Sequence, residues 1–209
     1  MNNGWQNPSG AQPASATVAA TAALVGAFAL PGGSRDSDIQ VTVSPGGYTS
    51  VLTSTDGTSG IALLELYDAD GSSNPGSRII NVSDRMNVAP GNGLLIAGFV
   101  ISGTGSKTVL IRGVGPGLAS LGLAGALPDP RIALVSGSTV LATNSNWATG
   151  SSSAAQISAM DTQVGAFALA SGSADAALLV TLQPGQYSVE VTSAGGSTGV
   201  VLLEVYDTQ

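Results

Sequence analysis

Short apolar runs recur along most of the chain, and clusters of Gly, Ser, Asn and Pro separate them. In the C-terminal two thirds, the runs begin roughly every ten residues, which is the pattern of strands in a sandwich or a barrel. The predicted strands are residues 78–83, 94–102, 108–114, 132–135, 139–142, 176–182, 187–193 and 200–206. Turn-forming residues predict hairpins at 103–106 and 136–138, and a tight turn at 183–186. The tyrosine after that Pro-Gly turn is expected to tether a hairpin through its hydroxyl.

One segment of this region has a different period. Ile157, Met160, Val164 and Phe167 are spaced three and four residues apart, which predicts a short helix within residues 154–167. The glycine-rich stretch 113–117 lacks the lysine and the spacing of a phosphate-binding loop, so we expect a turn there.

The chain also repeats itself. Residues 26–30 and 165–169 share the sequence Gly-Ala-Phe-Ala-Leu, and the similarity continues through Tyr48 and Tyr187 to the end of the chain. Counterparts downstream of the shared pentapeptide are a constant 139 residues apart. Trp5 corresponds to Trp147 with a shift of three residues in the intervening loop.

This repeat predicts the domain organisation. Residues 1–71 are expected to form the second half of a repeat, residues 72–77 a linker, and residues 78–209 a complete repeat. Met1 falls opposite Thr143, at the end of a predicted strand, so the chain is expected to begin inside a repeat. One short helix is expected in each repeat.

Composition narrows the function classes. The net charge is −7, only 9% of residues are charged, and Cys and His are absent. The scarcity of Lys and Arg argues against a nucleic-acid partner, and no apolar run reaches the roughly 18 residues of a membrane span. The Gly-, Ser- and Thr-rich, lysine-poor composition indicates an extracellular or cell-surface protein.

Candidate catalytic groups are few. Without His and Cys, the usual nucleophile and base pairs cannot form. Glu65, Glu190 and Glu204 are the only glutamates, each in a predicted strand, and Glu65 and Glu204 are repeat counterparts. A pair of acids facing each other across a cleft is therefore not expected, and we predict that the chain is not an enzyme.

Two other residue pairs are candidate binding sites. Asp68 and Asp70 precede a glycine, as in a calcium loop, although a turn with local hydrogen bonds explains the same pattern. No cofactor is expected, with Ca²⁺ as the alternative. Trp5 and Trp147 are candidates for stacking on a sugar, although packing of the rings explains their amphipathic character equally.

Several segments resemble a known family. Residues 129–134 (Asp-Pro-Arg-Ile-Ala-Leu), 139–146, 183–191 and 195–200 resemble the bacterial pre-peptidase C-terminal domain. Residues 93–116 are similar to repeats of very large surface proteins of environmental Gram-negative bacteria. The resemblance implies an all-β, jelly-roll-like β-sandwich on a secreted protein and no catalytic activity. The stretch 144–147, where some members of the family bind calcium, carries no carboxylate here.

The half repeat is the most informative prediction. Its expected strands, at 39–43, 48–53 and 61–67, are as apolar as those of the complete copy, so an isolated half would leave strand edges and a hydrophobic face uncovered. The residues expected at an assembly interface are Ile39, Val41, Val43, Val51, Ile61 and Leu63. Another subunit of the same protein would complete the half in a head-to-tail surface fibre. One alternative is a carbohydrate-binding or adhesive module of a larger secreted protein, with residues 1–71 as a truncated repeat. The other is packing of residues 1–71 on the complete repeat as a third layer.

Overall fold

The structure is a computed structural model that describes residues 4–6, 12–70, 77–91 and 93–209. The chain divides into two compact units, Met1–Ile79 (unit 1) and Ile80–Gln209 (unit 2). Most of the linker expected at 72–77 lies outside the described residues.

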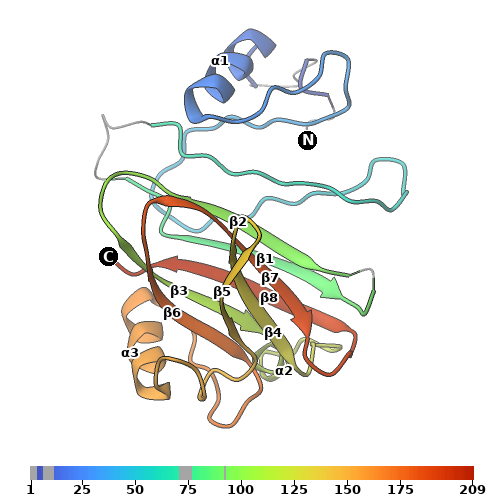
Figure 1. Cartoon of the computed structure of the whole chain (residues 1–209). Coiled ribbons are helices and arrows are strands. Elements are labelled where there is room, and N and C mark those ends of the chain that lie inside the picture. Colours follow the sequence, from blue (N-terminus) through green and yellow to red (C-terminus); the bar gives the residue numbers. More distant parts are fainter. Residues whose placement is uncertain (1–3, 7–11, 71–76, 92) are drawn as a thin grey trace. The chain divides into compact units, whose positions relative to one another are not determined.

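Unit 2 is a sandwich of two four-stranded antiparallel sheets (Figure 1). Its strands are β1 (Asn81–Val88), β2 (Leu95–Ile101), β3 (Lys107–Val114), β4 (Pro130–Ser136), β5 (Thr139–Asn144), β6 (Ala176–Leu182), β7 (Gly185–Ser193) and β8 (Gly199–Asp207). The sheets have the strand orders β1-β8-β3-β6 and β2-β7-β4-β5. These are the orders of an eight-stranded jelly roll, so the predicted fold class is confirmed.

This topology interleaves the two halves of the unit. We call residues 80–144, which carry β1–β5, the first half, and residues 145–209, which carry β6–β8, the second half. Strand β6 pairs with β3, β7 pairs with β2 and β4, and β8 pairs with β1 and β3. Every ladder of the second half is therefore made with the first half, and none joins two strands of the second half.

Two apolar clusters hold unit 2 together. The first, which we call the sandwich core, lies between the sheets and includes Ile111, Ile132, Leu178, Val189 and Leu203. The second, the helix-side core, covers the outer face of the β1-β8-β3-β6 sheet. Its members include Leu110, Leu118, Trp147, Ile157 and Leu202. Strands β3 and β8 alternate between the two clusters, so both of their faces are buried, as their nearly continuous apolar sequences require.

The helix expected within 154–167 is α3 (Ala154–Val164). Ser153 and Gln156 form a capping box at its start, and Gly165 ends it in the left-handed conformation at φ 74°. A second helix, α2 (Pro116–Ser120), occupies part of the glycine-rich stretch in which only a turn was expected. The helix begins at Pro116 because the fixed φ of proline suits a first helical turn. The residue before it is glycine because a side chain at position 115 would collide with the Leu127 carbonyl.

Only one of the expected hairpins is present. Strands β4 and β5 pair across residues 136–139, with a register shift after Leu134. The hairpin expected at 103–106 is wrong, because β2 and β3 belong to different sheets. The turn at 183–186 likewise leads from β6 in one sheet to β7 in the other, and the Tyr187 hydroxyl closes it by donating to Gln183 O at 2.8 Å. Turn chemistry fixed the reversals of the chain but not the sheet to which each strand returns.

The described part of unit 1 contains one helix, α1 (Ser15–Val25), which ends at Gly26 with φ 76°. The prediction of strands at 39–43, 48–53 and 61–67 is wrong, because the described part of unit 1 contains no strand and these residues run as coil (Figure 1). The topology of unit 2 gives the reason: these segments correspond to β6, β7 and β8, which find all of their ladder partners in the first half.

Candidate assembly surface

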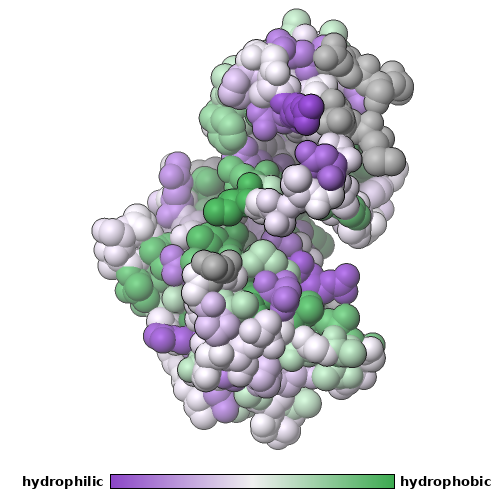
Figure 2. Space-filling view, turned by 90° about the vertical axis from the view of Figure 1, so that its right-hand side faces the viewer, coloured by the Kyte–Doolittle hydropathy of each residue, from purple (hydrophilic) through white to green (hydrophobic). Residues whose placement is uncertain are grey.

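The apolar side chains of these coil segments are exposed although their counterparts in unit 2 are buried. Ile39 is 62% exposed and its counterpart Leu178 is 3% exposed; for Leu64 and its counterpart Leu203 the values are 56% and 1%. We call the exposed Val, Ile and Leu residues of these three segments whose counterparts join either core of unit 2 the open face. They are Ile39, Val41, Val43, Leu52, Ile61, Leu63, Leu64 and Leu66. Apolar side chains of the chain reach its surface as green patches in Figure 2.

Five of the six residues expected at the interface belong to the open face, and Val51 differs. The counterpart of Val51 is Glu190, a half-exposed acid on the outer side of β7, whereas the counterpart of Leu52 is Val191 in the sandwich core. The period of two along a strand places neighbouring residues on opposite faces, so Leu52 is the core-facing residue of this pair. Comparing the two copies position by position would have found it.

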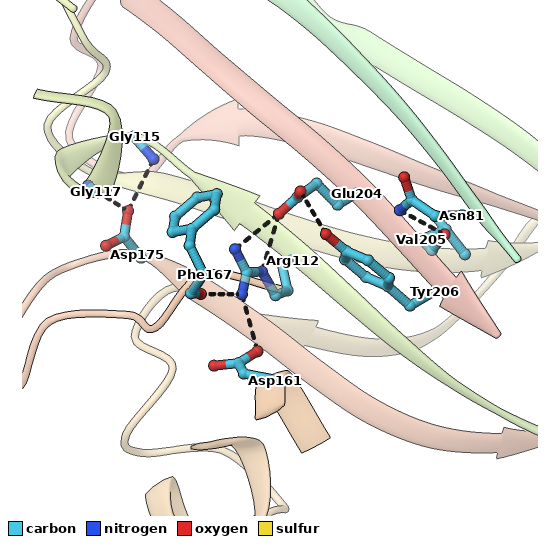
Figure 3. Close-up of polar contacts among 10 residues, drawn as sticks. All are labelled: Asn81, Arg112, Gly115, Gly117, Asp161, Phe167, Asp175, Glu204, Val205 and Tyr206. Atoms are coloured by element: carbon cyan, nitrogen blue, oxygen red, sulfur yellow. Dashed lines mark hydrogen bonds and ion pairs between the residues drawn. The ribbon is translucent and has the colours of Figure 1, made fainter. Parts of the chain in front are cut away.

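Unit 2 shows what the counterparts of the open face enclose. Arg112 on β3 is fully buried within the helix-side core (Figure 3). Its Nε donates to Glu204 Oε2 at 3.0 Å, and its Nη1 donates to Asp161 Oδ1 at 2.9 Å and to Phe167 O at 2.6 Å. Its Nη2 lies 2.8 Å from Glu204 Oε2, within ion-pair reach but without hydrogen-bond alignment. The guanidinium also lies 4.4 Å from the centroid of the Phe167 ring. Arg112 therefore ties β3 to β8, to α3 and to the loop after α3.

Burial perturbs two groups around this arginine. Loss of hydration raises the pKa of Asp161, and the Arg112 guanidinium offsets part of that rise. Burial also raises the pKa of Tyr206 far above its usual range, and the neighbouring Glu204 carboxylate, which accepts the Tyr206 hydroxyl at 2.7 Å, adds to the rise. Tyr206 therefore keeps its hydroxyl proton at neutral pH, and it donates this proton to Glu204.

Two further acids of the second half bind groups of the first half. Asp207, on β8, accepts the ammonium of Lys107 on β3 at 2.9 and 3.0 Å. Asp175 is fully buried and its Oδ1 accepts the backbone N–H groups of Gly115 and Gly117, which lead into α2 (Figure 3). All three contacts join the two halves of the unit.

The half repeat keeps all three of these acids. Glu204, Asp207 and Asp175 correspond to Glu65, Asp68 and Asp36, which are exposed in unit 1. Tyr67 donates to Glu65 Oε1 at 3.1 Å, as Tyr206 does to Glu204. Asp161 is not kept, since its counterpart is Ala22. The groups of the first half that would meet these acids have no counterpart within residues 1–71.

The two tryptophans are buried. Trp147 is 4% exposed and its Nε1 donates to Ser173 Oγ at 3.1 Å. Trp5 is 9% exposed and its Nε1 donates to the carbonyl of Pro31 at 3.0 Å. Neither ring offers an open face for stacking on a sugar. Trp147 also donates to the carbonyl of Ala170, the counterpart of Pro31, so the two tryptophans make the same backbone contact in both units.

The candidate calcium residues form a turn. Asp68 Oδ1 accepts the backbone N–H of Asp70 at 3.0 Å, the local hydrogen bond typical of an Asx turn. Among the described residues, no three acidic, His or Cys side chains come together as a group that could hold a metal ion.

Two remaining features concern the surface. A shallow hollow on the outer face of the β2-β7-β4-β5 sheet is lined by Arg131, Ala133, Val140, Thr143, Glu190 and Thr192. Within the part of the chain that the structure describes, no helix is long and apolar enough to cross a membrane.

Comparisons with known proteins give little beyond the resemblance. No protein-family model matches the chain, and a search of curated proteins finds no match. Among solved structures, the pre-peptidase C-terminal domain of a collagenase from Bacillus anthracis is similar, with a TM-score of 0.36 and 13% identity over 60% of this chain and 89% of that one. At that distance the likeness carries no argument about function, and the jelly roll rests on the strand pairing of unit 2. The chain is thus similar to a pre-peptidase C-terminal domain, the kind of domain that its sequence resembles.

Proposed function

We propose that this protein is a non-catalytic, extracellular structural module, a subunit of a bacterial surface fibre that is joined to its neighbour by strand complementation of the half repeat. The observation that carries the proposal is the open face: extended apolar segments without ladder partners, whose counterparts are fully paired strands in the same chain. Unpaired, apolar strand segments are templates for pairing with another chain.

The composition supports the extracellular and non-catalytic parts of the proposal. A lysine-poor surface with few charges, no cysteine and no histidine suits a stable module exposed to the outside of the cell. The buried ionisable cluster around Arg112 is enclosed by α3 and by the loop that carries Phe167, so its groups stabilise the sandwich rather than face a substrate. The shallow hollow on the outer sheet face is the candidate site for the polysaccharide-binding alternative.

Neighbouring residues provide a matched test of the proposal. Leu52→Glu places a charge on the open face, whereas Val51→Glu gives unit 1 the acid that unit 2 already has on its outer side. Both side chains are exposed in the isolated chain, at 54% and 76%, so the two changes remove similar amounts of apolar surface. A difference between the variants therefore reports which face is used.

The measurement is the mass of the full-length protein over a concentration series by light scattering, with electron microscopy of the largest species. We expect concentration-dependent linear assemblies from the unchanged chain and from Val51→Glu, and monomer from Leu52→Glu. An unchanged chain that remains monomeric at high concentration, or two variants that behave alike, would refute complementation through the open face.

A further inference from the structure

We propose that the occupant of the open face is the first half of a repeat of this same kind, a segment that corresponds to β1–β5 and carries an arginine at the position of Arg112. This inference rests on the proposed function and specifies the partner. Three independent features of the described residues lead to it: the strand topology, the charges of the half repeat and the order of its apolar positions.

The topology names the missing strands. In unit 2, β6 needs β3, β7 needs both β2 and β4, and β8 needs both β1 and β3. A single added strand, as in simple edge pairing, would leave most of these strands without a hydrogen-bonded partner. Only a segment with counterparts of β1–β4 provides a partner for every strand of the half repeat.

The charged residues of the half repeat indicate which residues its partner carries. The only charged residues of β3 are Lys107 and Arg112, the only ones of β8 are Glu204 and Asp207, and the four form two ion pairs. The half repeat carries Glu65 and Asp68 at the same two positions. Closing a sandwich over Glu65 without a cation would bury an uncompensated carboxylate, which is strongly unfavourable. A partner strand with arginine and lysine five residues apart satisfies both acids.

A third acid points to the loop after that strand. Asp175 holds the backbone N–H groups of Gly115 and Gly117, and its counterpart in the half repeat is Asp36. A side chain at residue 117 would approach the Asp175 carboxylate and Val114 too closely, so a glycine belongs there. The partner is therefore expected to continue from its arginine into a glycine-rich turn like residues 113–117.

The apolar positions of the half repeat match both clusters of unit 2. Ile61 and Leu63 correspond to Val200 and Leu202 of the helix-side core, and Leu64 corresponds to Leu203 of the sandwich core. Helix α1 and Trp5 already occupy the places of α3 and Trp147. The half repeat thus lacks the first half alone.

A second copy of residues 1–209 meets this need only in part. Each copy contains one first half, and the second half of its own unit 2 already pairs with it. If that first half paired with the half repeat of a neighbouring copy, the second half of its own unit 2 would lose its partner strands. Pairing between copies is thus limited to strand edges, whereas an additional first half closes the open face completely.

The test supplies a first half to the intact chain. The donor is residues 78–142 of this protein, which carry β1–β4 and most of β5, produced as a separate polypeptide. It is refolded with the full-length chain, and the complex is measured by light scattering and calorimetry. We expect a one-to-one complex that no longer self-associates. In the donor, Arg112→Met is expected to weaken binding about 100-fold or more, since it removes one partner of a buried ion pair. Lys107→Met is expected to weaken it less than about fivefold, because its pair is partly exposed.

Variants of the chain localise the donor. Glu65→Met is expected to weaken binding of the unchanged donor and to restore part of the binding of the Arg112→Met donor, because the charge is then lost on both sides. Asp56→Asn removes the same charge from an exposed turn outside the predicted strand pairing and is expected to change nothing. If the isolated donor aggregates, residues 78–142 fused ahead of Met1 supply the same strands within one chain. The hydrogen exchange of residues 61–67 is then expected to slow to that of residues 200–206.

The outcomes separate this inference from the proposed function. Binding that does not depend on the donor arginine would overturn the partner proposed here and leave complementation intact. Self-association that Leu52→Glu abolishes, together with no donor binding and no protection in the fusion, would show that edges of a second copy are the occupant. A monomeric chain that neither binds the donor nor gains protection in the fusion would overturn both proposals.

Discussion

The buried arginine of unit 2 provides the sharpest test of the forces that hold the sandwich together. Arg112→Met keeps most of the side-chain volume and removes the guanidinium that compensates Glu204 and Asp161. Removing one partner of a buried ion pair costs about 3–5 kcal/mol, because the remaining charge stays buried. Since Arg112 is fully buried and its partners are 5% and 2% exposed, this full range applies. For a unit of this size, the loss corresponds to a decrease in melting temperature on the order of 10–15 °C.

The free energy of unfolding is obtained from urea titrations followed by Trp147 fluorescence, in a Trp5→Phe background that silences unit 1. In Arg112→Met the Asp161 carboxyl loses its cation, so its pKa, which burial already raises in the folded state, rises further. The native variant then holds more protons, and its deficit relative to the unchanged protein shrinks as the pH falls from 7 toward 4.

Two results would refute this reasoning. One is a cost below about 1 kcal/mol at pH 7, the range of an ordinary exposed pair. The other is a cost that does not change with pH. Adding Glu204→Gln and Asp161→Asn to Arg112→Met is the matched control, and it should recover a large part of the loss because the uncompensated charges are then absent.

Three further predictions follow from the same contacts. Asp161→Asn should change the free energy of unfolding by less than about 1 kcal/mol at neutral pH, because Glu204 still compensates the charge of Arg112. The half repeat has the same pattern, with Glu65 at the position of Glu204 and Ala22 at that of Asp161. Burial raises the pKa of Asp161 in the folded state, so its ionisation lowers the stability of the unchanged protein as the pH rises above about 4. Urea titrations of Asp161→Asn from pH 4 to 7 should lack this loss, and a pH dependence parallel to that of the unchanged protein would contradict the prediction. Leu203→Ala should cost about 2–5 kcal/mol in thermal unfolding, whereas Leu64→Ala should stay within about 0.5 kcal/mol; equal costs would show that the open face is covered. Asp175→Ala should cost about 1–3 kcal/mol in urea unfolding, since two buried N–H groups lose their acceptor, and a neutral substitution would contradict that role.

Much of unit 2 could be predicted from its sequence. Alternating apolar residues located the strands, and the spacing of Ile157, Met160 and Val164 located α3, because both signals are local. The hairpin at residues 103–106 was predicted wrongly because a Gly-rich turn specifies a reversal but not the sheet of the next strand. Strand order is decided by contacts between distant residues, such as Arg112 and Glu204, which are 92 positions apart.

The site was predictable in outline only. The repeat predicted an uncovered half and five residues of its open face, because counterparts of core residues are apolar. Val51 was assigned to the same face because apolarity was considered without the register, and its counterpart Glu190 supplies the missing signal. The sequence did not single out Glu65, because the ion pair of its counterpart Glu204 with Arg112 becomes apparent only when the pairing of β3 with β8 is known.

The most direct measurement of the central claim compares the two copies of the repeat within one molecule by hydrogen exchange. Backbone amides of residues 178–182 and 200–206 should exchange only through global opening of unit 2, because they lie in paired strands. Amides of their counterparts, residues 39–43 and 61–67, should exchange at nearly the rate of an unstructured chain in the dilute protein, except that of Gln40, which donates to Gln12 Oε1 at 3.1 Å. Slow exchange of both copies at a concentration where the protein is monomeric would contradict an open half repeat.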